Sequence, residues 1–426
     1  MDFPPRPLRW LFLDLNSYFA SVEQQLNPRL RGRPVIVAPV DSETTCAIAA
    51  SYEAKRYGIK TGTPIWEARR RCPDLTVVPA QHDHYVAFHE KIVAEINRHI
   101  PVTQICSIDE VACRLMDNEN DEDFARALAM RIKRGITQNV GAYLTSSVGI
   151  APNRLLAKLA SDMMKPDGLI VLRDDTLPEQ LYTLKLGDIC GIGRRMERRL
   201  AMKGVNSIRQ FCALGPRAAG KVWGGTPGDR LWYLLHGVDL PEKPTQSRSI
   251  GHSHVMAPDL RGPNGSLFTA RRLALKATSR LRSKAYQTRL LVLHARFEVS
   301  KAHWNMAAKM RSTQDSFAVL AALDTLWPHL LAAGSAHPGG FRLFMIGVTL
   351  NHIEPVAAQQ GTLFPFLDPS AGLACETRTL ALSQAMDRLN TRFGNHMVSL
   401  GPDLRPLNQR SHKAHWFQKA NDQASC

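Results

Sequence analysis

The chain has 426 residues, which is more than a single hydrophobic core usually holds, so about two to four domains are expected. Its hydrophobic content of 44% excludes global disorder. The 54 Lys and Arg against 38 Asp and Glu give a net charge of +16, which indicates a polyanionic partner, most often nucleic acid. Composition alone leaves open a charged, soluble enzyme without such a partner.

No apolar run approaches the roughly 18 residues that would cross a bilayer. The N-terminal MDFPPRPLRW has Pro and Asp where a signal peptide needs an uninterrupted apolar core. The eight cysteines are scattered and form no CxxC pair, so neither a disulfide framework nor a zinc site is expected. We therefore expect a reduced, cytoplasmic protein without a membrane partner.

From the N-terminus to about residue 180, short apolar strands alternate with amphipathic helices. The predicted strands are RWLFLDL (9–15), GRPVIVAP (32–39), one in 47–73, the region 106–115 and the start of 146–168. The predicted helices are 17–26, two short helices in 47–73, 83–99, 121–139 and a basic helix that Lys165-Pro166 stops. Ser17 can cap the first helix. This order predicts one α/β unit whose sheet brings the ends of the Asp14 and Asp109 segments together.

After residue 180 the pattern changes. Residues 181–240 are predicted to be mostly helical, Arg-rich and interrupted by Gly, and PEKPTQSR (241–248) is typical of a linker. The elements that follow are a strand (249–255), a basic helix (265–286), two β-rich runs (288–298 and 303–311), a helix (315–333) and a strand (341–352). That order predicts a small α+β module with helices on one face of a sheet. Residues 355–426 show little periodicity apart from a helix near 376–393.

CSIDEVAC (106–113) places two adjacent carboxylates, Asp109 and Glu110, in a β-prone segment. Carboxylates are rarely buried without compensation of their charge. If this segment meets the end of the Asp14 strand, the two can supply several oxygen ligands to a pair of divalent cations about 3.5–4 Å apart. The alternative is that Asp109 and Glu110 cap a hairpin or pair with arginines, and an isolated DE pair favours that alternative.

Six blocks occur in the order found in one polymerase family: DLNSYFASVE (14–23), GRPVIV (32–37), AASYEAKRYGIKTGTP (49–64), SIDE (107–110), SVGIAPNRLLAKLASDMMKPDG (147–168) and GIG (191–193). Over residues 9 to 352 the sequence resembles the bacterial DinB/UmuC part of the Y-family, or translesion, DNA polymerases. Asn16 is more similar to the UmuC branch, whereas SYEAK is more similar to the DinB branch, so the branch stays open.

The resemblance implies a multidomain α+β fold, a right-hand polymerase of palm, fingers and thumb with an extra C-terminal domain called the little finger. The implied ranges are palm at 1–22 and 82–180, fingers at 23–81, thumb with a helix-hairpin-helix at 181–240, linker at 241–248, little finger at 249–354 and tail at 355–426. Primer-template DNA and deoxynucleoside triphosphates would be the partners of a monomer acting in the SOS response to DNA damage.

The resemblance also implies a catalytic site with two Mg²⁺ ions. Asp14 and Asp109 would ligate the metals, and Leu15 would add its backbone carbonyl. Glu110 would hold the metal at the primer 3′-hydroxyl. The reaction would be in-line attack of that hydroxyl on an α-phosphate.

For the incoming nucleotide, the resemblance makes Phe19 a steric gate that leaves no room for a 2′-hydroxyl. The alternative is a core Phe on an amphipathic helix. Tyr18 would pack beneath the nucleotide or offer its backbone N–H to phosphate. The side chains expected to grip the triphosphate are Tyr52, Lys55, its neighbour Arg56, which can share or take the role of Lys55, and Lys165.

DNA would be held by two regions. GIG, with Gly191 and Gly193, resembles the hairpin of a helix-hairpin-helix, which binds phosphate through backbone N–H groups. The alternative is an ordinary helix–turn–helix corner. The basic helix carries Arg271, Arg272, Lys276, Arg280, Arg282 and Lys284, and Arg289 follows in the next strand, a density that suits a strip along phosphates or, as the alternative, a solvated helix face.

In the tail, QGTLF (360–364) carries Gln360, Leu363 and Phe364 at the spacing of the bacterial sliding-clamp motif. A sliding clamp is therefore an expected partner. Together these features favour a template-directed DNA polymerase of low processivity. Two other interpretations are a non-catalytic DNA-binding scaffold of the same family and a two-metal nuclease or phosphotransferase. The first is disfavoured because all three acids are present, and the second leaves Phe19 and QGTLF unexplained.

Overall fold

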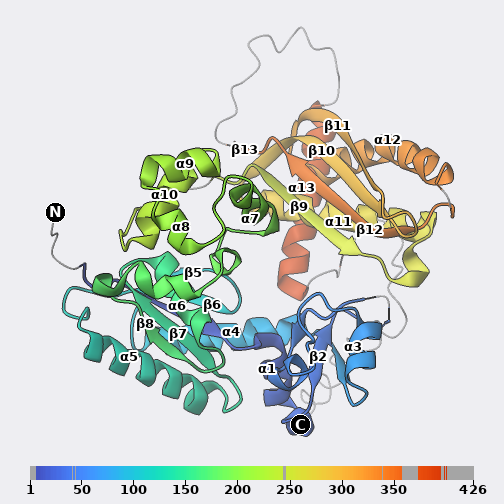
Figure 1. Cartoon of the computed structure of the whole chain (residues 1–426). Coiled ribbons are helices and arrows are strands. Elements are labelled where there is room, and N and C mark those ends of the chain that lie inside the picture. The colour runs from blue at the N-terminus through green and yellow to red at the C-terminus, as the bar shows by residue number, and fades with distance from the viewer. Residues whose placement is uncertain are drawn as a thin grey trace. The chain divides into compact units, whose positions relative to one another are not determined.

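The computed structural model describes residues 6–40, 42–43, 45–242, 246–337, 339–356, 373–394, 398 and 400. The chain forms two compact units, residues 1–242 and 243–426, whose elements are labelled in Figure 1. The boundary falls inside the predicted linker at 241–248. The finer division of the first unit into palm, fingers and thumb stays a prediction. Gln360, Leu363 and Phe364 lie outside the described residues.

A five-stranded sheet in the order β5-β6-β1-β7-β8 forms the centre of the first unit. Its strands are β1 (Trp10–Leu15), β5 (Val102–Ile105), β6 (Glu110–Arg114), β7 (Ser146–Ala151) and β8 (Leu169–Val171). β1 lies between β6 and β7 and is antiparallel to both. Every residue of β1 is buried, which explains its continuous apolar sequence. The predicted strand at 106–115 is shorter than expected, because residues 106–109 form the loop between β5 and β6.

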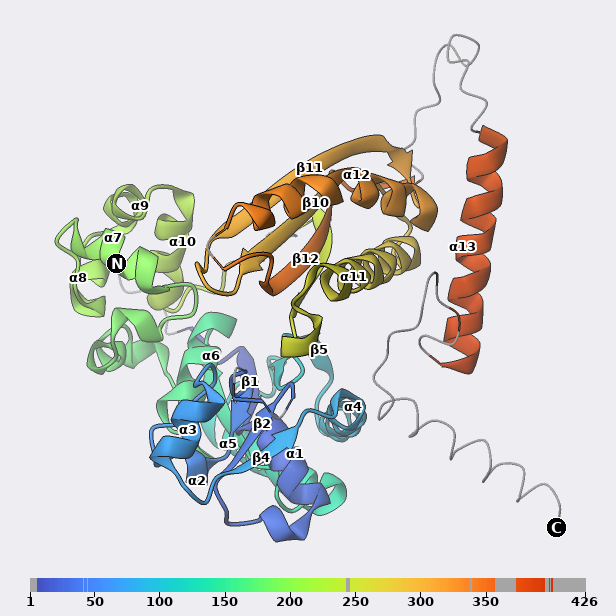
Figure 2. The same cartoon turned by 90° about the vertical axis from the view of Figure 1, so that its right-hand side faces the viewer.

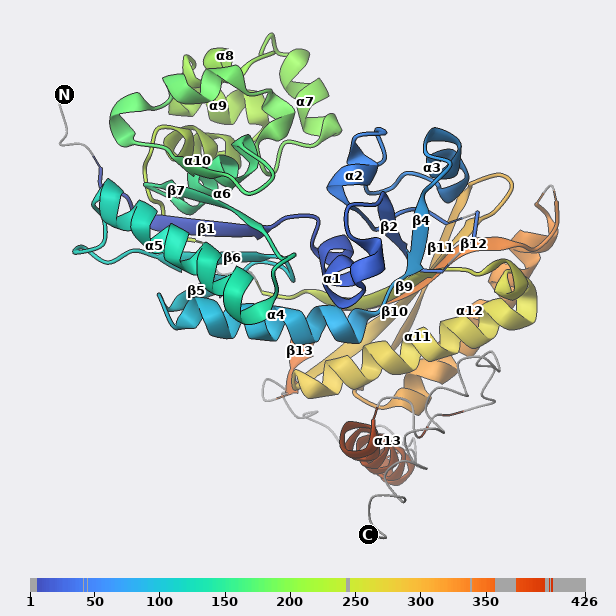
Figure 3. The ribbon, with the colours of Figure 1, turned by 90° about the horizontal axis from the view of Figure 1, so that it is seen from below.

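Helices cover both faces of this sheet. Alternate residues of β1 point to opposite sides, so Leu11 and Leu13 join the core with α4 (His82–Asn97) and α5 (Glu122–Gly135). Figure 3 shows α4 and α5 running along the same face. Trp10 and Phe12 join a second core with α6 (Arg154–Met163). The predicted helix at 121–139 continues past α5 as one wide π turn, Ile136–Val140.

Residues 18–79, which follow β1 in the chain, form a smaller α/β layer with a sheet of its own. It holds α1 (Tyr18–Leu26), a 3₁₀ turn (Pro28–Leu30) and a sheet of β2 (Val35–Ala38), β3 (Ala49–Ala50) and β4 (Thr76–Pro79), with α2 (Tyr52–Lys55) and α3 (Ile65–Arg71). The prediction that Ser17 caps α1 through its side chain is wrong. Ser17 adopts a left-handed backbone conformation with φ of 49°, and its hydroxyl makes no cap hydrogen bond. Such a conformation is not visible in the sequence.

Residues 173–237 form the helical part of the first unit. The elements are three 3₁₀ turns (Asp174–Thr176, Glu179–Thr183 and Leu186–Asp188), α7 (Arg194–Ala201), α8 (Ile208–Cys212), α9 (Pro216–Trp223) and α10 (Thr226–Leu235). Asn153, which is fully buried, joins this part to the central sheet. Its Oδ1 caps α6 at the Leu156 amide, and its Nδ2 donates to the carbonyls of Leu234 and Val238 at 2.8 and 3.1 Å.

The second unit is a five-stranded antiparallel sheet in the order β11-β10-β12-β9, with β13 paired to β10 off this path and helices on one face, as predicted. Its elements are β9 (Ser249–Val255), a 3₁₀ turn (Pro258–Leu260), α11 (Pro263–Ser283), β10 (Tyr286–Phe297), β11 (His303–Thr313), α12 (Ser316–Ser335), β12 (Leu343–Asn351), β13 (Glu354–Pro355) and α13 (Leu373–Phe393). Figure 2 shows α11 and α12 beside the sheet and α13 next to them.

Among the described residues, α12 alone is long and apolar enough to cross a membrane. It packs on the sheet through Val319, Leu323 and Leu330, which are buried in the core of this unit. A helix that buries one apolar side in a core passes the same test of length and composition. The six cysteines whose side chains are described are free.

Candidate active site

The carboxylates predicted to act together meet at the ends of β1 and β6. Asp14 and Glu110 are directly paired across the two strands. The Leu15 amide donates to the Asp109 carbonyl at 2.9 Å, which fixes the loop residue Asp109 beside the end of β1. Asp14 is only 6% exposed, whereas Asp109 and Glu110 are partly buried. The expectation that these segments lie side by side is confirmed.

Two lysines compensate the charge of these acids. Lys158 Nζ lies 2.6 Å from Asp14 Oδ2 and 2.9 Å from Glu110 Oε1. Lys165 Nζ lies 2.7 Å from Asp14 Oδ1 and 2.7 Å from Asp162 Oδ1. Burial alone would lower the pKa of Lys158, but Asp14 and Glu110 outweigh that effect and raise the pKa above its ordinary value. Both lysines are therefore charged at neutral pH.

Sequence reasoning missed Lys158. A lysine on a basic amphipathic helix is usually solvated, and nothing in its immediate neighbours distinguishes it. The helical spacing of Lys158 and Asp162 was the available signal, because residues four apart lie on one face of a helix. That face points toward Asp14.

The fit of this site to metal ions can be judged from the donor atoms. Carboxylate oxygens are the ligands that Mg²⁺ prefers, and a single cationic group already contacts both Asp14 and Glu110. The Asp109 carboxylate instead accepts a hydrogen bond from Ser107 Oγ at 2.5 Å. In the described part of the chain, no three acidic, His or Cys side chains are arranged as a metal cluster. The donor chemistry fits, and the hydrogen bond from Ser107 occupies only Oδ1 of Asp109.

Phe19 lies on α1 and is partly exposed. Its ring stacks on Tyr85 with the centroids 4.3 Å apart, and His82 meets it edge-on at 6.3 Å. Tyr85 is fixed in turn by donating its hydroxyl to Glu23 at 2.7 Å. A fixed aromatic surface therefore supports one face of the partly exposed Phe19 ring.

Tyr18 has a different environment from the one expected for a nucleotide-binding side chain. Its ring is buried in the core, and its hydroxyl donates to the Tyr85 carbonyl at 2.6 Å. The prediction that Tyr18 packs beneath the nucleotide is therefore wrong, because the ring is enclosed by protein. The backbone N–H of Tyr18 lies at the first residue of α1, and its predicted contact with phosphate stays a prediction.

The predicted phosphate-gripping residues converge near Asp14. Lys55 Nζ lies 4.2 Å from the centre of the Tyr52 ring. Burial lowers the pKa of Lys55, the positive charge of Lys165 lowers it further, and Asp14 opposes them. Burial raises the pKa of Tyr52. These mutual influences place Tyr52, Lys55 and Lys165 in one cluster around Asp14. Lys55 and Arg56 are both exposed at the end of α2.

Gly191 and Gly193 precede α7 as predicted. Gly191 has a φ of +97°, a conformation that favours glycine, and Gly193 occupies the N-cap position. A Cβ at either position would meet nothing within 4 Å, so the backbone of this turn is open to an approaching group.

The arginines predicted as a single phosphate strip point in several directions. Arg282 is the clearest correction, because its side chain is only 7% exposed and is directed into the protein. Its Nε and Nη2 donate to Asp387 of α13 at 2.6 and 3.0 Å, and its Nη1 donates to the Gln314 carbonyl and Ser316 Oγ. This geometry gives Arg282 a structural role instead of a DNA-binding one. Arg271 pairs with Asp324 of α12 at 2.6 Å.

A narrower strip is present on the side of α11 that faces β9. Arg272, Lys276 and Arg280 are four residues apart, so they share one helix face. Burial lowers the pKa values of His252 and His254 on β9, and the charges of this strip lower them further. The strip therefore lies beside β9.

The sheet face away from α11 and α12 carries a second set of groups that the sequence analysis did not single out. Leu291, Leu293 and Ala295 of β10 point into the core, so the residues between them point to the opposite face. On the neighbouring β11 the same alternation places Lys309 and Arg311 on that face, where both are exposed. This open face thus carries exposed positive charge among residues that include the apolar Val292.

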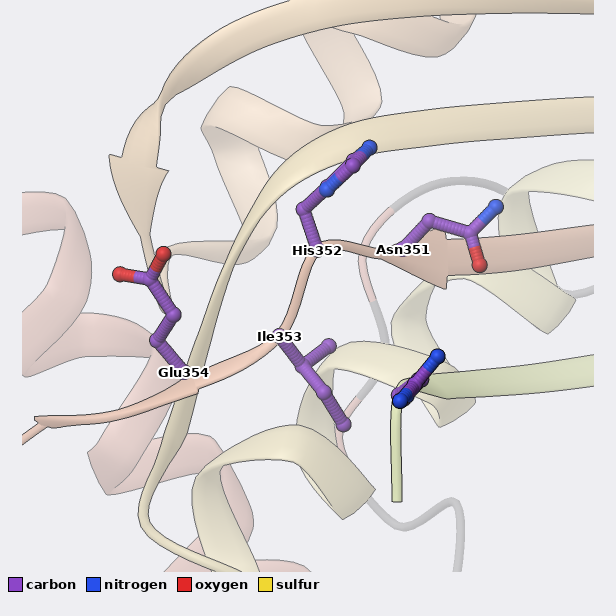
Figure 4. Close-up of a pocket in the computed structure, with 5 residues that line it drawn as sticks. Asn351, His352, Ile353 and Glu354 are labelled. Carbon is purple, nitrogen blue, oxygen red and sulfur yellow. The ribbon is translucent and has the colours of Figure 1, made fainter. Parts of the chain in front are cut away.

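A pocket of about 450 Å³ lies at the end of β12, lined by Arg248, Asn351, His352, Ile353 and Glu354. Figure 4 shows that the side chains of Asn351, His352 and Glu354 point in different directions instead of toward one point. Glu354 is already paired with Arg289 at 3.0 Å. No predicted site residue lies in this pocket, and its side chains do not converge on a common ligand.

Comparison with known proteins agrees with this geometry. The model of the impB/mucB/samB family matches residues 13–162, and the model of that family's C-terminal domain matches residues 247–363. The chain is 32% identical over 400 residues to DNA polymerase IV of Moorella thermoacetica, covering 91% of this chain and 94% of that one. It is 28% identical over 402 residues to DNA polymerase IV 1 of Bacillus subtilis, covering 92% of each chain.

Among solved structures, the chain is similar to a Y-family DNA polymerase chimera, Dbh-Dpo4(243-245)-Dbh, with a TM-score of 0.68, 25% identity, and coverage of 82% of this chain and 99% of that one. These matches extend over both units and include the strand ends that carry Asp14 and Glu110. The chain therefore belongs to the impB/mucB/samB family of Y-family DNA polymerases and is DinB-like. Its activity is that of a DNA-directed DNA polymerase, in the class that carries out translesion synthesis.

Proposed function

We propose that this protein extends primer-template DNA, with low processivity and past damaged bases, by nucleotidyl transfer at the carboxylates of Asp14, Asp109 and Glu110. The new bond joins the primer 3′-oxygen to the α-phosphorus, the bond to pyrophosphate breaks, and the hydroxyl proton is lost. The observation that carries this proposal is the direct pairing of Asp14 with Glu110 across β1 and β6, beside the Asp109 loop.

Two Mg²⁺ ions held by Asp14, Asp109, Glu110 and the Leu15 carbonyl would lower the pKa of the attacking hydroxyl and neutralise charge on the triphosphate. The protein's own contribution is to fix the ligands. The strand pairing holds Asp14 and Glu110 in register, and the hydrogen bond from the Leu15 amide to the Asp109 carbonyl keeps the third acid close. Preorganised charge of this kind stabilises the transition state without reorganisation.

The incoming nucleotide is placed by the cluster around Asp14. Lys55 and Lys165 supply positive charge to the triphosphate, Tyr52 donates its hydroxyl, and the exposed Arg56 lies next to Lys55. Phe19, supported by Tyr85, presents a flat surface to the sugar and excludes a 2′-hydroxyl. The backbone N–H of Tyr18 adds a further phosphate donor.

Duplex DNA is held without reading its sequence. The open turn at Gly191 and Gly193 offers backbone N–H groups to phosphate. In the second unit, Arg272 and Arg280 belong to the strip beside β9, while Arg271 contributes only if its pair with Asp324 opens. Because such contacts release counterions, the affinity for DNA falls steeply as salt rises.

The decisive experiment is primer extension by the purified protein with Mg²⁺ and four deoxynucleotides, alongside Asp109→Ala. Asp109 contributes a hydrogen bond to Ser107 and no core packing, so the variant folds and still binds DNA. We expect extension to be lost and DNA affinity to be kept. Equal extension by both proteins would disprove the catalytic assignment. Extension by neither, with DNA binding retained, would favour a non-catalytic scaffold.

Two further parts of the proposal concern the protein's surroundings. Gln360, Leu363 and Phe364 would dock in the groove of a sliding clamp, so replacing all three with Ala should reduce clamp-stimulated synthesis and spare basal synthesis. The protein would act as a cytoplasmic monomer. Elution from a sizing column at the mass of a dimer would contradict the monomeric state.

A further inference from the structure

Asn16 follows β1 directly and is a buried amide beside the catalytic carboxylates. It is only 2% exposed. Its Nδ2 donates to Ser147 Oγ at 3.0 Å, while its Oδ1 accepts from the Asp167 amide at 2.8 Å and from Thr145 Oγ1 at 3.2 Å. Both ends of the side chain are therefore used, one as a donor and the other as an acceptor.

Ser147 continues this network from the first residues of β7. Its hydroxyl is fully buried and accepts from Asn16 and from the Gly168 amide at 3.3 Å. It donates to the Met164 carbonyl at 3.4 Å. Asn16 and Ser147 thus bind backbone groups on both sides of Lys165-Pro166.

The turn that they hold is tight. A Cβ added to Gly168 would lie 1.9 Å from the Met164 carbonyl oxygen, so the chain must double back closely at this point. The Lys165 side chain is 28% exposed, and its ammonium group lies 2.7 Å from both Asp14 Oδ1 and Asp162 Oδ1. The backbone of the turn fixes the point from which this side chain reaches the two carboxylates.

We infer that the Asn16–Ser147 pair is a positioning device that sets where Lys165 meets the triphosphate of the incoming nucleotide, and thereby sets the KM for that nucleotide. The inference rests on the proposed role of Lys165. An amide suits this place because an apolar side chain at residue 16 would remove the acceptor of the Asp167 amide and one of the two donors to the Ser147 hydroxyl. Asn16 acts through Lys165 and does not itself touch the substrate.

The test is single-nucleotide incorporation by the full-length protein, with kcat and KM for the deoxynucleotide measured separately. Asn16→Ala should raise KM about tenfold, the ratio given by one lost hydrogen bond of ordinary strength, and leave kcat within about threefold. Thr145→Val is the matched control, since it removes a donor to the same Oδ1 but keeps the bond to Asp167. Its KM should stay within about twofold of wild type, because that bond still holds the turn.

A double variant separates positioning from general damage. Lys165→Ala should raise KM, and Asn16→Ala with Lys165→Ala should raise it no further, because both changes remove the same contact. Additive effects of the two changes would overturn the inference. An unchanged KM for Lys165→Ala would instead overturn the proposed role of that lysine. Ser147→Ala provides the same comparison if Asn16→Ala unfolds, with circular dichroism and DNA affinity as checks on folding.

Discussion

Two networks of charged groups, one in each unit, differ in how completely their members are held. In the first unit, Asp14 is bound by the ammonium groups of Lys158 and Lys165, which are long side chains that can move away. In the second, Arg282 uses Nε, Nη1 and Nη2 on fixed partners, including a two-point contact with Asp387. The comparison teaches that a carboxylate paired with flexible lysines can release them to bind a substrate or metal. An arginine whose guanidinium nitrogens are all hydrogen-bonded instead holds two parts of the structure together.

The largest effect on stability is expected from Arg282→Ala. The change leaves Asp387 without its partner and loosens α13 from α11, so the free energy of unfolding of the second unit should fall by about 3 kcal/mol or more. Denaturant unfolding measures this. The control is Arg271→Ala, whose exposed pair with Asp324 should cost less than about 1 kcal/mol. Similar losses for both would refute the structural role of Arg282.

The largest effect on catalysis is expected from Asp14→Ala. The variant loses a carboxylate that two lysines share, so single-turnover extension should slow by about 10²–10³-fold or more. Glu43→Ala, which removes an exposed partner of Arg69, should extend at the normal rate. A rate within tenfold of wild type for Asp14→Ala would contradict the distinction between the two networks.

A smaller effect is expected at the sugar of the nucleotide. Phe19→Ala should raise ribonucleotide incorporation relative to deoxynucleotide by about tenfold to a hundredfold, because the surface that excludes the 2′-hydroxyl is removed. The ratio of kcat/KM values for the two nucleotides measures it. Phe124→Ala, on the exposed side of α5, is the control. Unchanged discrimination would leave Phe19 as a core residue only.

Lys276→Ala should weaken DNA binding modestly and equally on all sequences. Removing one phosphate contact lowers the slope of log affinity against log salt by about 0.9. Fluorescence anisotropy at several salt concentrations measures the slope. Arg289→Ala, whose guanidinium is paired with Glu354, should leave it unchanged. A strip that does not contact DNA would give the same slope for both variants.

Another buried carboxylate, that of Glu95, sharpens the comparison through the pH dependence of stability. Burial would raise its pKa, but Asn139, His99 and Arg98 outweigh that effect and lower it. A lowered pKa means that ionised Glu95 stabilises the fold above its unfolded pKa of about 4.3, and that this stability is lost as the pH falls below it. Unfolding of wild type and Glu95→Gln should therefore differ at pH 6 and converge near pH 3. A constant difference would show that ionisation is not the cause.

Much of the fold followed from sequence patterns because it depends on local periodicity. The apolar run ending at Asp14 predicted β1, and the alternation of short strands and helices predicted the sheet that brings Asp14 to Glu110. The roles of the three carboxylates and the polymerase architecture came instead from the resemblance to the Y-family polymerases. Periodicity alone predicted the α/β layers and not the polymerase.

The errors came from contacts between segments far apart in the chain. Helix periodicity gave the charges of α11 but not the fact that α13, about a hundred residues later, would bury Arg282. Lys158 was missed because only the folded sheet shows that its helix face points at Asp14. Ser17 was wrongly predicted to cap α1 through its side chain, because the residue type does not reveal that its backbone is left-handed.

The fully buried Asn153 has a mechanical consequence. One end of its amide starts α6, the helix that carries Lys158, and the other end grips the last turn of α10. Moving the α7–α10 part without α6 would break two buried hydrogen bonds, each costing about 1–3 kcal/mol when its partner is left unsatisfied. A motion that carries both parts together keeps these bonds, so we expect the α7–α10 part and α6 to move as one body joined at Asn153. A displacement of the α7–α10 part would then also move Lys158 on α6.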